Sequence, residues 1–128
     1  MFTLTKKADY GMALLSILAQ KGRLGRVSLA ELSKMGMPRA FVAKIAGSLV
    51  EVGILNSKEG KGGGFSLNYE PGEIQIKEAL EAIEGVVEPV DCVGCPMGGS
   101  CGQQSFMDRL TLDIEKILAK YTLKDLIK

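Results

Sequence analysis

Apolar residues recur at helical spacing near the start of the chain. Within residues 5–20 they stand three and four positions apart, at Tyr10, Ala13, Leu14, Ile17 and Leu18. A stripe of this period lies along one face of an α-helix. The sequence therefore predicts an amphipathic first helix whose apolar face packs against a core.

Two further helices are expected after a glycine-containing loop. Ser28 precedes the segment LAEL and Glu31 stands three residues further on, which is typical of a capping box. This short helix is expected to end near Gly36. Pro38 suits the first position of a third helix, which reaches about Val52. Two helices joined by so short a turn are typical of a helix-turn-helix.

The third helix has two contrasting faces. Its core-facing stripe is expected at Phe41, Ile45, Leu49 and Val52. The opposite face begins at Arg39 and continues with small or charged residues at Ala40, Ala43, Lys44, Gly47 and Glu51. Small side chains let a helix enter a DNA groove, and cations meet phosphates or guanine edges there. An ordinary exposed helix face explains this pattern equally well when it is taken alone.

A β-hairpin is predicted next, because the segments ILNSK and FSLNY bracket a glycine-rich stretch. A hairpin directly after a helix-turn-helix is a wing. Glycine lets a backbone approach another surface closely, so the basic tip is expected to touch DNA. A plain turn is the alternative. The hairpin residues expected at the DNA are Lys58, Lys61, Gly62 and Gly63.

The second half of the chain predicts two more helices. The segment IKEALEAIEG (76–85) is amphipathic, and a longer helix is expected over 103–121. The apolar stripe of the longer helix is too long for one small core to cover, so we expect it to pair two subunits. The fold class is thus mainly α with a small β-wing. A winged helix-turn-helix DNA-binding part over 1–75 and a cysteine-loop and dimerisation region over 76–128 are expected to form one integrated domain. The stripe comprises Phe106, Leu110, Ile114, Ile117, Leu118 and Tyr121.

Charge is divided unevenly between the halves of the chain. Residues 1–64 hold ten Lys/Arg and four Asp/Glu, a net charge of +6, whereas residues 65–128 hold six and eleven, a net charge of −5. A basic front half suits a polyanionic partner. No apolar stretch approaches the roughly 20 residues that span a bilayer, and no cleavable leader is evident, so we expect a cytoplasmic protein.

All three cysteines, Cys92, Cys95 and Cys101, fall in the segment DCVGCPMGGSC, and the chain has no histidine. Clustered thiols in a loop rich in Gly and Pro are not a packing pattern, because buried cysteines are usually scattered. Thiolate ligation of an iron–sulfur cluster or of zinc fits the spacing about equally. A thiol redox switch is a third interpretation.

The order of these segments resembles the Rrf2 family of bacterial winged-helix regulators across almost the whole chain. The resemblance rests on ADYGMALL, on VSLAELSKMGMPRAFVAKIAGSLVEVGIL, on the wing GKGGGFSL, on the cysteines and on the closing YTLKDLI. It implies a homodimer that binds promoter DNA, with a [2Fe–2S] or [4Fe–4S] cluster on three cysteines. The gap between Cys92 and Cys95 is shorter than relatives commonly have, which leaves the cluster type open.

The resemblance also implies a carboxylate ligand in the first helix, at Asp9, donated by the partner subunit. We therefore expect a non-enzymatic regulator whose metal ligands are Cys92, Cys95, Cys101 and Asp9. A palindromic double-stranded operator is the expected DNA. Zinc or thiol oxidation in the same fold is the alternative, and a thiol-disulfide oxidoreductase is the rival from another class. The expected DNA-binding residues are Ser28, Pro38, Arg39, Ala40, Ala43, Lys44, Lys58, Lys61, Gly62 and Gly63.

Overall fold

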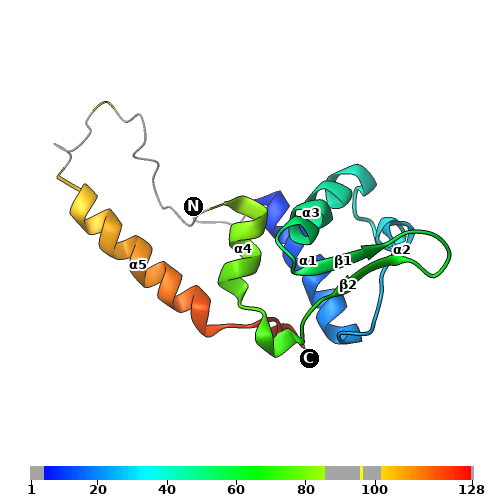
Figure 1. Ribbon diagram of the computed structural model, residues 1–128. Helices are drawn as coiled ribbons and strands as arrows, with labels where there is room; N and C mark the ends of the chain where they lie inside the picture. Colours follow the sequence, from blue (N-terminus) through cyan, green and yellow to red (C-terminus); the bar gives the residue numbers. More distant parts are fainter. Residues whose placement is uncertain (1–4, 86–95, 97–101, 128) are drawn as a thin grey trace.

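The computed structural model describes residues 5–85, 96 and 102–127 (Figure 1). It is mostly helical with one antiparallel two-stranded sheet, which confirms the predicted fold class. The main elements are α1 (Lys6–Lys21), α2 (Leu29–Lys34), α3 (Arg39–Glu51), β1 (Leu55–Lys58), β2 (Gly64–Leu67), α4 (Ile76–Glu84) and α5 (Gln104–Lys120). Two 3-10 turns, η1 (Pro71–Glu73) and η3 (Leu123–Leu126), lie before α4 and after α5.

Helix α1 runs through the centre of the helix-turn-helix half. Thr5 caps it by accepting a hydrogen bond from the Ala8 N–H at 3.1 Å. The predicted apolar stripe is right only at Leu14 and Leu18, which are fully buried; Tyr10, Ala13 and Ile17 are only partly buried, because the face toward the core is turned by about one residue. That face comprises Ala8, Gly11, Leu14, Leu15, Leu18 and Ala19.

The predicted capping box at the start of α2 is confirmed. The Glu31 N–H donates to the Ser28 hydroxyl oxygen at 3.1 Å, and the Ser28 N–H donates to the Glu31 carboxylate at 3.3 Å. Gly36 then takes a left-handed conformation, with φ of 95°, and turns the chain toward α3. Pro38 is the N-cap of α3 rather than its first helical residue, because its backbone is still extended.

One predicted core position of α3 is wrong. Val52 is 57% exposed and caps the end of the helix. The helix stops at Glu51 and Gly53 turns the chain into the hairpin, so Val52 faces away from the core. Phe41 is only partly buried. The buried stripe is instead Val42, Ile45, Ala46 and Leu49.

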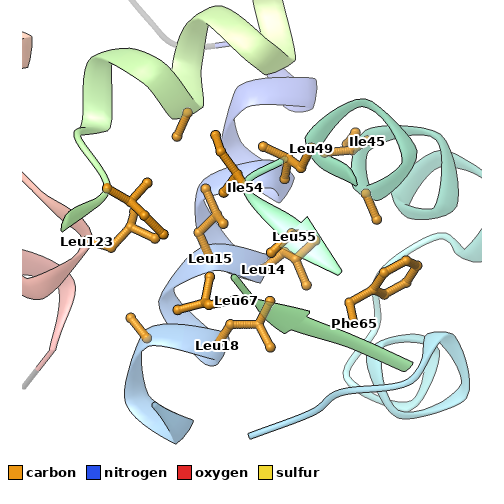
Figure 2. Packing of buried hydrophobic residues seen from close by; sticks show 14 of the residues in the cluster. Leu14, Leu15, Leu18, Ile45, Leu49, Ile54, Leu55, Phe65, Leu67 and Leu123 are labelled. Atoms are coloured by element: carbon orange, nitrogen blue, oxygen red, sulfur yellow. The ribbon is translucent and has the colours of Figure 1, made fainter. Parts of the chain in front are cut away.

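The hairpin adds its inner face to the core. Strands β1 and β2 pair from Leu55 opposite Leu67 to Lys58 opposite Gly64. Val27, just before α2, pairs with Phe65 on the other side of β2. The inner face packs against α1 and α3, as Figure 2 shows for the labelled core residues. The core therefore joins the helix-turn-helix to the wing and fixes their relative positions.

The segments after the hairpin differ sharply in burial. Helix α4 buries Ile76, Ala79 and Ile83 against the same core. Leu123 of η3 is fully buried there as well, so the end of the chain returns to the core. By contrast, α5 has no buried residue and extends beside α4, away from the helix-turn-helix (Figure 1).

Candidate nucleic-acid interface

The start of α3 is exposed and firmly placed. Arg39, Ala40 and Lys44 are exposed, and Ala43 is half-buried on the same side of the helix. Beneath them, the ring of Phe41 meets Tyr10 of α1 edge-on, with ring centroids 5.7 Å apart. This contact, together with the buried stripe of α3, holds the helix while its outer face stays open. The outer face is small and cationic, as the sequence predicts.

Contacts and backbone conformations within the protein itself explain why the wing contains glycines. Gly62 has a φ of 75° and Gly64 a φ of 131°, conformations that other residues rarely adopt. A side-chain carbon on Gly64 would also collide with the backbone of Val27, and one on Gly63 with the Lys58 carbonyl oxygen. What comes close at Gly63 and Gly64 is thus the protein's own backbone. At Gly62 the space around the missing side chain is open.

Cations on this side of the molecule lack carboxylate partners within the described residues. Lys58 and Lys61 on the hairpin are exposed, as are Arg39 and Lys44. Between residues that the structure describes, an ion pair forms at Lys77–Glu81, 3.6 Å apart on α4, and at no other place. The first turn of α3 also contains no acidic residue. The positive charge is therefore available to an external anion.

Ser28 is the N-cap of α2, and Pro38 is the N-cap of α3. The Ser28 hydroxyl is already engaged with Glu31, so it acts in the fold as a cap. Pro38 is exposed directly before Arg39. The structure thus gathers the sequence-predicted DNA residues on the helix-turn-helix and on the hairpin that follows it, on elements joined by one core.

The expected metal ligands are only partly described. Cys92, Cys95 and Cys101 lie outside the described residues. Asp9 is exposed in the first turn of α1, and within the described part of the chain no group of three potential ligands is close enough to hold a metal. At the same end of α1, the Thr5 hydroxyl donates to the Glu84 carboxylate, at the last residue of α4.

Sequence reasoning overlooked the loop between α1 and α2. From the sequence, Arg23 and Arg26 contributed only to the net charge of the basic half. In the structure they line a pocket at the base of the wing. Leu24 between them is 95% exposed. Two arginines in a short Arg-Leu-Gly-Arg turn are a sequence signal for anion binding, but only the tertiary structure brings this turn against the hairpin.

Together these features define a winged helix-turn-helix protein. The profile of the Rrf2 family, described as "Iron-dependent Transcriptional regulator", matches residues 4–128. The chain belongs to the Rrf2 family of transcriptional regulators, which confirms the resemblance seen in the sequence. Its relatives IscR and NsrR are named as transcriptional regulators.

Individual relatives agree with this assignment. The chain is 27% identical to the HTH-type transcriptional regulator IscR of Xenorhabdus nematophila, over 98% of this chain and 79% of the relative. It is 29% identical to the HTH-type transcriptional regulator NsrR of Bacillus subtilis, over 98% and 90%. The solved structure of CymR, the global cysteine regulator of B. subtilis, shares the fold with a TM-score of 0.77 at 24% identity, covering 98% of this chain and 96% of CymR.

A membrane-spanning helix is absent from the described residues, since none of their helices is both long and apolar enough.

Proposed function

We propose that this regulator is a cytoplasmic protein that binds a palindromic operator through α3 and the wing. The supporting observation is the set of exposed cations on these two elements without a described carboxylate partner. Arg39, Ala40, Ala43 and Lys44 face the bases, where one well-made pair gives about 1–3 kcal/mol of discrimination. Lys58 and Lys61, with Gly62 and Gly63, contact phosphates; Ser28 and Pro38 place the helix starts beside them.

The test of this interface is the salt dependence of DNA affinity. A duplex selected from a random pool by the wild-type protein serves as the operator. Lys61→Ala is expected to weaken binding to all sequences and to reduce the slope of log K against log salt by roughly one. Lys120→Ala, which removes the same charge from α5, is the matched control and should leave the slope unchanged. Equal slopes for Lys61→Ala and wild type would exclude a phosphate contact by the wing.

The regulator acts as a homodimer joined through α5. The helix has no buried side chain, and Phe106, Ile117 and Tyr121 on its apolar stripe are each more than half exposed. Helix α5 contacts α4, yet no position of its apolar stripe is fully buried, so a partner that covers the stripe would stabilise the helix. Two subunits also supply two recognition helices, as a palindromic operator requires.

The signal is received by an iron–sulfur cluster held by Cys92, Cys95, Cys101 and Asp9. Support comes from the description of the family as iron-dependent and from the types of ligand residue in the chain. Three thiols within ten residues and an exposed carboxylate, without histidine, are ligands that suit such a cluster. When bound, the cluster supplies redox chemistry and an iron open to small molecules such as nitric oxide.

Asp9 would link the cluster site to the DNA interface through α1. It stands on α1, and α1 packs directly against α3, which carries the recognition face. A partner subunit's Asp9 on the cysteine segment would tie the ligand state to the spacing of the two recognition helices. A carboxylate is a harder ligand than a thiolate for iron, so its bond is the one most easily exchanged.

Anaerobic purification with visible absorbance and with iron and sulfide analysis tests the cofactor. Cys92→Ser is expected to lose the absorbance, the sulfide and the response of DNA affinity to oxidant. Asp9→Ala is expected to weaken cluster retention, while Asp91→Ala, the matched carboxylate control, retains it. If Asp91→Ala loses the cluster and Asp9→Ala keeps it, Asp9 is not the ligand.

Mixed dimers decide which subunit donates Asp9. A heterodimer of an Asp9→Ala chain with a Cys92→Ser chain keeps one intact ligand set if Asp9 acts across the dimer. It keeps none if Asp9 acts within its own chain, an arrangement for which the Thr5–Glu84 hydrogen bond provides proximity. Half of the wild-type cluster content is expected, and complete loss would contradict donation by the partner.

A second candidate is the same regulator switched by zinc or by thiol oxidation. The two-residue gap between Cys92 and Cys95 favours it, since such a pair suits zinc or a disulfide as well as a cluster. Protein that contains zinc and no sulfide, or that loses two thiols on mild oxidation with a change in DNA affinity, would establish this switch in place of the cluster.

A further inference from the structure

A shallow pocket of about 210 Å³ opens at the base of the wing, where the loop between α1 and α2 passes the outer face of the hairpin. It has room for several waters or for a small anion. No acidic residue is among those that line it. Its polar side chains belong to Arg23, Arg26, Asn56, Ser66 and Asn68.

Arg26 is the unusual member of this pocket. Its Nη1 atom is shielded from solvent and has no hydrogen-bond partner within the described structure. No described carboxylate forms an ion pair with either Arg26 or Arg23. A shielded guanidinium nitrogen without a partner is unfavourable, because the charged donor has lost water and gained nothing in exchange. Arg26 also lines the pocket, so an anion bound there would offset a charge that no described carboxylate compensates.

The pocket is held in place by the backbone around it. The Gly25 N–H donates to the Gly22 carbonyl at 3.0 Å and closes a tight turn, and a side chain at Gly25 would collide with Lys21. The Phe65 N–H then donates to the Val27 carbonyl at 2.8 Å, which fastens the end of the loop to β2. The two arginines are therefore presented from a fixed turn.

Strand alternation sets the other wall. Asn56 lies opposite Ser66 in the register, so both side chains share the outer face of the hairpin. Arg26 precedes Val27, the partner of Phe65, and so it belongs to that face too. Neutral hydroxyl and amide groups thus stand beside two guanidinium groups.

We propose that this pocket, centred on Arg26 with Arg23 at its mouth, binds an oxyanion of the phosphate type. A guanidinium donates through a planar fork that matches two oxygens of such an anion, and charge-assisted hydrogen bonds are the strong ones. The outer-face residues Asn56 and Ser66 supply neutral donors at its side.

The same chemistry has two sources, free phosphate and a phosphate of DNA beside the operator. Ser28 follows Arg26 by two residues, and Lys58 follows Asn56 by two, so the pocket adjoins the proposed interface. Only the DNA source rests on the proposed function, and free phosphate tests the pocket without any DNA.

The first arm of the experiment titrates the full-length protein with inorganic phosphate and follows the Nε–Hε resonances of its arginines. Arg26 is expected to shift and saturate, and chloride at equal ionic strength is expected to leave it unmoved. Phosphate should also raise the melting temperature of the wild type but not of Arg26→Gln. Arg109→Gln, an exposed arginine on α5, is the matched control and should keep the phosphate effect.

The second arm uses the selected duplex with single phosphates replaced by neutral methylphosphonate. If DNA is the source, one replacement outside the bases read by α3 weakens wild-type binding about tenfold or more and has no further effect on Arg26→Gln. Saturable phosphate binding without any such position assigns the pocket to a free anion.

No saturable shift at Arg26 and no sensitive DNA position would overturn the proposal. If Arg26→Gln does not fold, Arg23→Gln takes its place in both arms, with the wild-type resonances as the direct reading. If neither the wild type nor any variant binds DNA but phosphate still binds at Arg26, the proposed function is rejected and the anion site is retained.

Discussion

Helices α3 and α5 are both amphipathic, but the protein uses their apolar faces differently. The thirteen residues of α3 bury Val42, Ile45, Ala46 and Leu49 within their own chain. The seventeen residues of α5 bury none, and only Leu118 packs partly against the core. The difference shows that helical periodicity in the sequence predicts an apolar face but does not predict which part of the protein covers that face.

This contrast suggests that folding stability and dimer association depend on different parts of the molecule. Helices α1, α3 and α4, the hairpin and η3 share one core, to which α5 adds only the partly buried Leu118. Burial of apolar surface supplies most of the favourable free energy of folding. We therefore expect the core to determine the free energy of unfolding and α5 to determine the association of two subunits.

The largest effect is expected from a charge on the apolar stripe of α5. In Leu110→Asp an uncompensated carboxylate enters the proposed interface, at about 3–5 kcal/mol, so the dimer should dissociate at micromolar concentration. Leu112→Asp makes the same change on the other side of the helix, where Leu112 is 55% exposed, and should stay dimeric. Analytical ultracentrifugation measures both. A monomeric wild type, or dissociation by both variants alike, would disprove the assignment of the stripe.

The next effect concerns the core itself. Leu14 is fully buried in α1, so Leu14→Ala is expected to lower the free energy of unfolding by about 2–5 kcal/mol. Leu24→Ala removes the same atoms from an exposed position and should change it by less than about 0.5 kcal/mol. Urea denaturation at fixed protein concentration compares the two. Similar midpoints would mean that the loop of Leu24 is covered in solution.

The smallest of these effects compares two glycines. Gly64→Ala forces a side chain into a left-handed backbone and against Val27, and should destabilise the protein by about 1–3 kcal/mol. Gly47 lies on the exposed face of α3 with open space around it, so Gly47→Ala should stabilise the helix by up to about 1 kcal/mol. Thermal unfolding gives both signs. Destabilisation by Gly47→Ala would show that this face of α3 is covered.

The sequence by itself was sufficient for the elements and for their class. The capping box of Ser28 and Glu31 and the glycine turns depend on neighbours in the chain, and they formed where local chemistry placed them. The hairpin and α5 appeared within a residue or two of the expected bounds for the same reason. The cationic, small-residue face of α3 is likewise a local property.

Only the tertiary structure decided which positions are covered and by what. Val52 has the right spacing for the core stripe, yet Gly53 turns the chain and exposes it. Gly64 is required because the backbone of Val27, distant in sequence, passes where its side chain would be. Arg26 became part of a pocket through the same pairing of Val27 with β2. Burial depends on contacts between distant segments, and no local pattern contains them.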